Sequence, residues 1–248
     1  MPGRGNIEEI FESVQGEGPL VGIRQVFVRF GGCNLSCEYC DTPQARRPTA
    51  TCRFQPSVIT SEHEFIPNPV NCENIIAMVD KLWSSGYHSV SLTGGEPLVQ
   101  VEFLKDFAAE LKESGRAVYL ETNGTLFEEL DEVIEHVDYV AVDVKLPSVT
   151  GENDRFEDNR RFLEKCVSKP LFVKLVVSES VNADEFAAAL GVIRSSATES
   201  ITVIQPVVSL RGDVEVSAGL LLSLQKVALK VLPDVRVIPR VHHILRLA

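Results

Sequence analysis

Three cysteines within eight residues constrain this chain more than any other feature. Cys33, Cys37 and Cys40 have the spacing C-x3-C-x2-C and directly follow a run of strand-forming residues. Thiolates bind soft metals and iron–sulfur clusters, and three so close in sequence can surround one site without long-range folding. A cubane cluster has four irons, so three protein thiolates leave one iron free to bind a small molecule. An open site of this kind is typical of catalysis rather than of structure.

The alternatives to a cluster are a structural zinc site, a redox C-x-x-C pair and a set of disulfides. A zinc site needs a second cysteine pair, but the other cysteines, Cys52, Cys72 and Cys166, are isolated. A redox pair does not need Cys33. Six cysteines in 248 residues, with no apolar leader in the first residues, are not the pattern of a small disulfide-rich domain. The spacing therefore favours a cluster, and we expect Cys52 and Cys72 to be structural thiols.

The composition predicts a globular protein with a sizeable core, since 44% of the residues are hydrophobic and 24% are charged. Lys and Arg number 24 against 35 Asp and Glu, a net charge of −11, which argues against a nucleic-acid partner. No stretch approaches the ~18 apolar residues of a membrane span. We expect a cytoplasmic protein, because thiols stay reduced in that compartment.

Strand-like and helix-like segments alternate along most of the chain. Strands are predicted at 25–30, 89–93, 117–122, 139–145, 171–177, 201–205 and 235–238. Helices are predicted at 75–83, 101–113, 127–136, 159–168, 183–197 and 217–232. This alternation predicts an α/β fold with a parallel sheet and helical crossovers. We interpret residues 7–19 as an ordered loop and the proline-rich residues 43–71 as an irregular insertion.

Polar or glycine-rich segments follow several of the predicted strands, where ligands of parallel α/β proteins collect. They are Thr93-Gly94-Gly95-Glu96-Pro97, Glu121-Thr122-Asn123-Gly124, Asp143-Val144-Lys145 and Gln205-Pro206. The Gly94-Gly95 pair permits close backbone approach, and Glu96 is a candidate partner for a cationic group. Taken alone, Thr93-Gly94-Gly95-Glu96-Pro97 is equally well explained as a turn between a strand and a helix.

Together, the cysteine spacing, the Gly-Gly-Glu-Pro segment and the alternating elements resemble the radical S-adenosylmethionine superfamily. Within it, residues 11–18 (F-E-S-V-Q-G-E-G), residues 26–42 and the tail 242–248 resemble the 7-carboxy-7-deazaguanine synthase family. The resemblance implies a partial (β/α)6-type barrel in one domain over residues 1–248. The insertion would occupy about 43–71, and the tail 239–248 would close the substrate site.

The resemblance also implies a reaction. Members of this family are lyases that convert 6-carboxy-5,6,7,8-tetrahydropterin to 7-carboxy-7-deazaguanine and release ammonia, on the way to queuosine and archaeosine. The implied cofactors are a [4Fe–4S] cluster, S-adenosylmethionine and Mg²⁺. The implied partners are a reductant such as flavodoxin or ferredoxin and a second copy of the chain in a homodimer. The cofactor supplies the chemistry, so no side chain is expected to act as a catalytic acid or base.

The family's ligand positions transfer to this chain residue by residue. Cys33, Cys37 and Cys40 match the cluster ligands, and Thr42 matches a Mg²⁺ ligand. The S-adenosylmethionine contacts match Tyr39, Cys40, Asp41, Gly95, Asp143, Val144, Lys145, Gln205, Pro206, Val207 and Val208. The substrate contacts match Val14, Gln15, Gly16, Arg29, Thr93, His242 and Ala248. The chain departs from the family pattern at Arg240, where glutamine is common, and in the length of the insertion.

Two other classes of protein share part of this pattern. An activating enzyme of the same superfamily, which forms a glycyl radical on a partner protein, has the cysteine spacing but should lack Q-G-E-G and the histidine tail. A non-catalytic zinc or electron-transfer module predicts four protein ligands and no substrate pocket, whereas this chain offers three cysteines.

Overall fold

The computed structural model describes residues 3–57, 62–209 and 211–247 and contains one large sheet covered by helices. The sheet has ten strands in the order β12-β11-β10-β9-β8-β7-β3-β2-β4-β5. Its strands are β2 (Ile7–Val14), β3 (Arg24–Phe30), β4 (Thr51–Phe54), β5 (Glu64–Pro67), β7 (Ser89–Gly94), β8 (Val118–Thr122), β9 (Tyr139–Val144), β10 (Leu171–Val177), β11 (Ile201–Pro206) and β12 (Val235–Val237). A separate antiparallel pair joins β1 (Arg4–Gly5) to β6 (Val70–Asn71).

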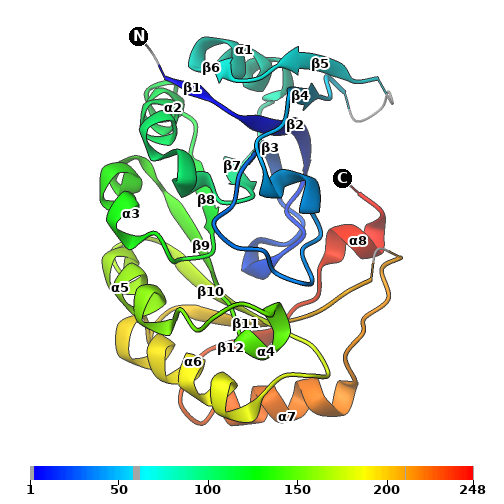
Figure 1. Ribbon diagram of the computed structural model, residues 1–248, viewed down its shortest axis with the longest axis vertical. Helices are drawn as coiled ribbons and strands as arrows, with labels where there is room; N and C mark the ends of the chain where they lie inside the picture. Colours follow the sequence, from blue (N-terminus) through cyan, green and yellow to red (C-terminus); the bar gives the residue numbers. More distant parts are fainter. Residues whose placement is uncertain (1–2, 58–61, 210, 248) are drawn as a thin grey trace.

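The strands from β3 through β12 in this order are parallel to their neighbours, and helices connect them. The helices are α1 (Cys72–Leu82), α2 (Val101–Glu113), α3 (Phe127–Val133), α4 (Pro147–Thr150), α5 (Phe156–Cys166), α6 (Ala183–Ser196), α7 (Ala218–Ala228) and α8 (Val241–Leu245), with 3-10 turns at η1 (Gly18–Leu20), η2 (Pro43–Arg46), η3 (Pro97–Gln100) and η4 (Ile134–His136). Helices α2, α3, α5, α6 and α7 follow the outer side of the curved sheet, whereas α8 lies on the opposite side (Figure 1). The predicted parallel α/β fold is confirmed.

The two faces of the sheet have separate cores. On the outer face, alternate strand residues such as Val173 and Leu175 pack with the helices in the main core. On the inner face, a smaller cluster contains Tyr119 and Phe172, with Leu20 of η1 packed against it. Gly18 begins η1 at φ +66, and a Cβ there would overlap the Phe172 ring. The inner face thus has an apolar floor beneath the polar strand ends.

Two sequence-based interpretations are wrong. Residues 7–14, expected in a loop, form β2, which pairs antiparallel with β3 and parallel with β4. Residues 43–71, expected to be irregular, contain η2, β4, β5 and β6, and β4 with β5 extends the sheet. That segment includes residues 58–61, which lie outside the described residues. The predicted helix at 75–83 is confirmed as α1, and its N-cap is Asn71, which accepts a hydrogen bond from the Asn74 N–H at 2.9 Å.

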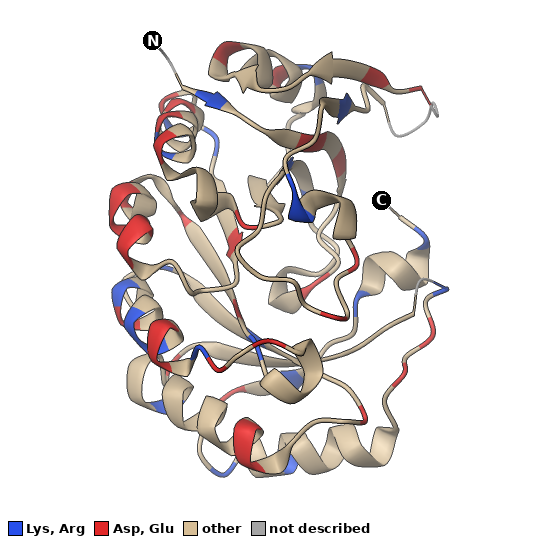
Figure 2. Cartoon of the chain, in the orientation of Figure 1, with Lys and Arg blue, Asp and Glu red and all other residues tan. Residues whose placement is uncertain are grey.

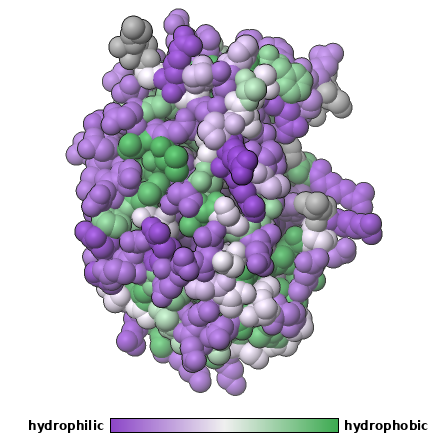
Figure 3. All heavy atoms as spheres, in the orientation of Figure 1, coloured by the Kyte–Doolittle hydropathy of each residue, from purple (hydrophilic) through white to green (hydrophobic). Residues whose placement is uncertain are grey.

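The surface is largely hydrophilic in the view of Figure 3, and acidic segments lie along the outer helices (Figure 2). Among the described residues, no helix has the length and apolar character needed to cross a membrane.

Candidate active site

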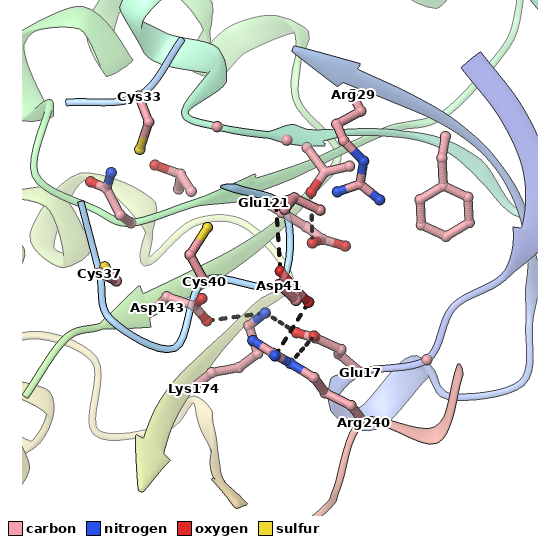
Figure 4. Close-up of a pocket in the computed structure, with 18 of the residues that line it drawn as sticks. Glu17, Arg29, Cys33, Cys37, Cys40, Asp41, Glu121, Asp143, Lys174 and Arg240 are labelled. Carbon is pink, nitrogen blue, oxygen red and sulfur yellow. Dashed lines mark hydrogen bonds and ion pairs between the residues drawn. The ribbon is translucent and has the colours of Figure 1, made fainter. Parts of the chain in front are cut away.

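A pocket opens on the inner side of the sheet, at the carboxyl ends of its parallel strands. It is lined by the loop after β2, the end of β3, the cysteine loop, the ends of β7, β8 and β9, one residue of β10 and the start of the tail (Figure 4). All three cysteines of the C-x3-C-x2-C motif line it. Segments distant in sequence therefore meet around one cavity, as the strand-end prediction required.

The cysteine loop is held by backbone hydrogen bonds to the rest of the chain. The N–H groups of Gly32 and Cys33 donate to the carbonyls of Ala45 (2.8 Å) and Arg46 (3.1 Å) in η2. The N–H of Glu38 donates to the carbonyl of Thr150 at 2.9 Å. The position of the three thiols is therefore fixed by the fold.

The thiols fit a multi-iron cluster better than a single ion. Burial raises the pKa of Cys33 to about 11 and also raises that of Cys37, so each thiolate needs a bound cation for stability. Within the described residues, only Asp41, His242 and His243 bring three such ligand atoms within 4.8 Å of one another. The three Sγ atoms therefore do not all lie within 4.8 Å of one another, whereas the thiolates of a tetrahedral zinc site are about 4 Å apart.

The Gly94-Gly95 pair brings β7 against the cysteine loop. A Cβ on Gly95 would overlap the carbonyl oxygens of Gly32 and Ala45, and Gly94 has φ +119. The glycine pair was expected to allow close approach of a ligand, and the close approach that the structure shows is to the backbone of the cysteine loop and of η2. Glu96 was expected to pair with a cationic group, but the structure places neutral donors around its carboxylate. It is fully buried outside the pocket lining, and its carboxylate accepts from the Asn123 N–H (2.7 Å) and the Thr122 hydroxyl (2.9 Å).

One side of the pocket carries a half-buried carboxylate with its donors. Glu121 accepts hydrogen bonds from Gln15 Nε2 (2.8 Å) and from the hydroxyls of Thr93 (3.0 Å) and Ser91 (3.3 Å). Burial raises the pKa of Glu121. Gln15 and Thr93 were predicted to contact substrate, and both line the pocket beside it.

Arg29 projects from β3 into the same pocket (Figure 4). Its Nε donates to Glu9 Oε1 at 2.8 Å, and its guanidinium lies over the Phe11 ring at 5.8 Å. Glu9 also pairs with Arg53, which lies outside the pocket lining. The hydrogen bond to Glu9 uses the Nε–H of the Arg29 guanidinium and fixes the direction of this side chain. The remaining N–H groups of the guanidinium are available for a ligand carboxylate.

A network of buried charges crosses the floor of the pocket. Glu17 pairs with Lys174 and, at 3.0 Å, with Arg240, and Lys174 reaches Asp143 at 3.0 Å. Asp143 also pairs with Lys145 at 2.8 Å. Burial opposes ionisation of Glu17, but Lys174 and Arg240 outweigh it and hold its pKa below the ordinary value. The network is fully paired and carries both signs, as buried charges require.

The structure brings most of the predicted site residues to this pocket. Those that line it are Val14, Gln15, Gly16, Arg29, Cys33, Cys37, Tyr39, Cys40, Asp41, Thr42, Thr93, Gly95, Asp143, Lys145 and His242. Those outside the lining are Val144, Gln205, Pro206, Val207 and Val208. Ala248 lies outside the described residues. Gln205 is fully buried, and its amide has no hydrogen-bond partner among the described residues.

Sequence reasoning assigned no site role to Glu17, Lys174 or Arg240, and it placed Glu121 only within a polar segment at a strand end. Lys174 carried the clearest signal, because it interrupts the apolar strand L-F-V-K-L-V-V. A lysine in a strand that is buried on both faces needs carboxylate partners, and here they are Glu17 and Asp143.

The comparisons with known proteins first define a class. Residues 27–190 match the family model of the Radical SAM superfamily. The chain is also 39% identical to the 7-carboxy-7-deazaguanine synthase of Geobacter sulfurreducens, over 95% of each chain. It is 38% identical to that of Methanopyrus kandleri, over 96% of this chain and 92% of the relative. The chain therefore belongs to the 7-carboxy-7-deazaguanine synthase family of the radical SAM superfamily.

Solved structures support the fold. The crystal structure of QueE from Escherichia coli aligns with a TM-score of 0.60 at 18% identity and covers 95% of this chain and 93% of that one. A radical SAM methyltransferase from Sphaerobacter thermophilus gives 0.60 at 13% identity, over 90% of this chain and 67% of that one. Family membership implies a [4Fe–4S] cluster and S-adenosylmethionine, and it favours the synthase over an activating enzyme or a non-catalytic module.

Proposed function

We propose that this chain is a lyase that converts 6-carboxy-5,6,7,8-tetrahydropterin to 7-carboxy-7-deazaguanine with release of ammonia. The observation that carries the proposal is that Arg29 and Glu121 line the same pocket as the three thiols. The substrate has a carboxylate and an amino-substituted ring, and this pocket offers a guanidinium and a carboxylate. The opposed charges of the two side chains would orient the substrate within the pocket.

Cys33, Cys37 and Cys40 would hold the cluster, and S-adenosylmethionine would occupy the adjoining subsite. When bound, the cluster and S-adenosylmethionine supply the radical chemistry. The chain's own side chains bind and orient. Arg29 takes the substrate carboxylate, and Glu121, held by Gln15 and Thr93, takes the amino edge of the ring.

Further residues complete the two subsites. We assign S-adenosylmethionine to Tyr39, Asp41, Gly95, Asp143, Lys145 and the segment from Gln205 to Val208. The buried amide of Gln205, which has no hydrogen-bond partner among the described residues, supports this assignment. Thr42 would supply a hydroxyl to Mg²⁺, a hard cation that suits oxygen ligands. His242 borders Gly16 in the pocket, which supports closure of the substrate site by the tail, residues 239–248.

The cellular setting is part of the same proposal. We place the enzyme in the cytoplasm. We propose that residues 1–248 form a single domain and that two copies of the chain form a homodimer. All six cysteines are free, which suits a reducing compartment. A flavodoxin or ferredoxin would supply the electron.

The test is an assay on protein reconstituted with iron and sulfide under anaerobic conditions. With dithionite, S-adenosylmethionine and the carboxypterin, mass spectrometry should detect 7-carboxy-7-deazaguanine and ammonia should accumulate with it. A reaction without dithionite is the control and should give neither product. Formation of 5′-deoxyadenosine with unchanged pterin would refute the assignment.

A further inference from the structure

One buried guanidinium, that of Arg240, joins three parts of the candidate active site (Figure 4). Its Nε donates to Glu17 Oε1 at 3.0 Å, and its NH1 lies 3.2 Å from Asp41 Oδ2. The guanidinium also lies over the Tyr39 ring, 5.9 Å from the ring centroid. Arg240 is 7% exposed. A single tail residue thus contacts the loop after β2 and the end of the cysteine loop.

The next residues of the tail add polar contacts to this attachment. The Val241 N–H donates to the Gly16 carbonyl at 2.8 Å, and His243 Nε2 lies 3.7 Å from Asp41 Oδ2. Beyond these contacts, α8 contains no buried residue, and Ile244 and Leu245 are about half exposed. Polar contacts at its first residues, rather than apolar packing, therefore hold the tail against the pocket.

The same contacts restrain the cysteine loop. Asp41 directly follows Cys40, and its carboxylate lies beside the Arg240 guanidinium and the His243 ring. Both belong to the tail. On the other side of Cys40, the ring centroid of Tyr39 lies 5.9 Å from the Arg240 guanidinium and 5.3 Å from the Lys145 ammonium. The residues on both sides of the third thiol are thus positioned by Arg240.

We propose that Arg240 is a positioning residue that couples the seating of the C-terminal tail to the order of Tyr39 and Asp41 in the S-adenosylmethionine subsite. The inference rests on the proposed function, because that subsite belongs to it. When the tail is displaced, Asp41 loses its contacts with Arg240 and His243, and the end of the cysteine loop loses its restraint. When the tail is seated, the loop is ordered and the subsite is complete.

Hydrogen exchange and ligand binding on the cluster-loaded protein test this coupling. Arg240→Gln keeps most of the side-chain volume and removes the charge. We expect amide exchange to accelerate about tenfold in two separate segments, 239–247 and 38–42, since each loses a charge-assisted contact. The dissociation constant for S-adenosylmethionine, measured without pterin by equilibrium dialysis, should rise about tenfold, while iron content stays unchanged.

Arg236→Gln is the matched control. Arg236 lies four residues earlier, pairs with Asp234 at 2.7 Å and has a side chain 46% exposed. It lies outside the pocket lining, so neither exchange nor binding should change. If Arg240→Gln does not fold, Arg240→Lys keeps a cation that can reach one carboxylate, and exchange in both segments should still rise together.

Two results would overturn the proposal. One is faster exchange in the tail alone, with the cysteine loop and the dissociation constant unchanged, because Arg240 would then only attach the tail. The other is no change in either segment. Failure of the proposed function gives a different result, in which the wild-type protein itself does not bind S-adenosylmethionine or does not convert the pterin.

Discussion

Two arginines share the buried carboxylate of Glu9, and only one of them faces the pocket. We predict that Arg29→Ala raises the KM for the carboxypterin by about 10- to 100-fold, the effect of losing a charge-assisted pair of hydrogen bonds. The cluster content should not change. Glu9 keeps Arg53 as a partner, so its charge stays paired and the variant should fold.

The matched control for this prediction is Arg53→Ala. It removes the other partner of Glu9 from a side chain that is 46% exposed, and KM should stay within about twofold of the wild-type value. Steady-state assays at saturating S-adenosylmethionine measure both variants. Equal KM values for Arg29→Ala and the wild type would remove Arg29 from the substrate site.

The buried carboxyl of Glu96 makes stability depend on pH. Burial raises its pKa to about 7, above the ordinary 4.5 that applies in the unfolded chain. The folded state therefore binds the proton more tightly than the unfolded chain does. Protonation of Glu96 contributes fully to the free energy of unfolding below pH 4.5, and this contribution is lost as the pH rises through 7. We predict that ionisation of Glu96 lowers the free energy of unfolding by about 3 kcal/mol between pH 4.5 and 7.

Urea unfolding of the wild type and of Glu96→Gln at several pH values checks this prediction. The glutamine does not ionise, so the wild-type free energy of unfolding should fall relative to that of the variant between pH 4.5 and 7. The subtraction removes the titration of every other group. A difference that stays constant over this range would show that Glu96 keeps an ordinary pKa.

At the residue scale, the sequence predicted residues that line the pocket better than it predicted the side chains that support them. The cysteine spacing and the strand-end glycines are local patterns, so Cys33, Cys40 and Gly95 could be assigned without the fold. The partners of Lys174 lie on two other segments of the chain. A buried ion pair is a long-range property, and only the folded chain identifies it.

At the element scale, β7 meets the cysteine loop at Gly95. We predict that Gly95→Ala destabilises the protein by about 3 kcal/mol, because an added methyl would overlap two backbone carbonyl oxygens that cannot move aside. The reconstituted variant should also bind less iron, since the displaced loop carries the thiols. Urea unfolding and iron analysis measure the two effects.

Gly191→Ala is the opposite case. Gly191 lies within α6, and nothing approaches within 4 Å of an added Cβ. Alanine should stabilise the helix by roughly 0.5–1 kcal/mol, because glycine loses more backbone entropy on folding. Iron content should match the wild type. A destabilised Gly191→Ala variant, or an unaffected Gly95→Ala variant, would contradict the geometric argument.

The elements that sequence analysis predicted are those with a regular apolar period, and α2 begins and ends where expected. Strand β2 escaped detection because Glu9 takes a buried position in it, neutralised by arginines from two neighbouring strands. An alternation rule assigns that position to an apolar residue. Strand β4 has only four residues, and its partners lie about 10 residues later and more than 40 residues earlier in the chain, so no local signal marks it.

At the scale of the whole molecule, the sheet holds the site together from both ends of the chain. Strand β2, near the N-terminus, provides one wall of the pocket, and the segment after β12 provides the buried Arg240. The main core lies between the sheet and the outer helices, on the face away from the pocket. The fold is thus supported by packing that does not involve the thiols.

This separation predicts how the protein responds to loss of iron. Many small metal-binding domains unfold without their metal, because the metal supplies most of their stability. Here the cysteine loop is anchored to η2 and α4 by hydrogen bonds from Gly32, Cys33 and Glu38. Chelation of the iron should therefore abolish activity but preserve the far-UV circular dichroism spectrum and a single cooperative urea transition.

The control is Cys40→Ala, which should give the same spectrum and transition without chelator, because it removes a cluster ligand from the start. Both samples are compared with the reconstituted protein under anaerobic conditions, since oxidation of free thiols would confuse the result. If either iron-free sample lost its cooperative transition, the barrel would depend on the cluster for its fold. If both retain it, the chain builds the thiol site before the cluster arrives, which allows the cluster to be inserted into a folded protein.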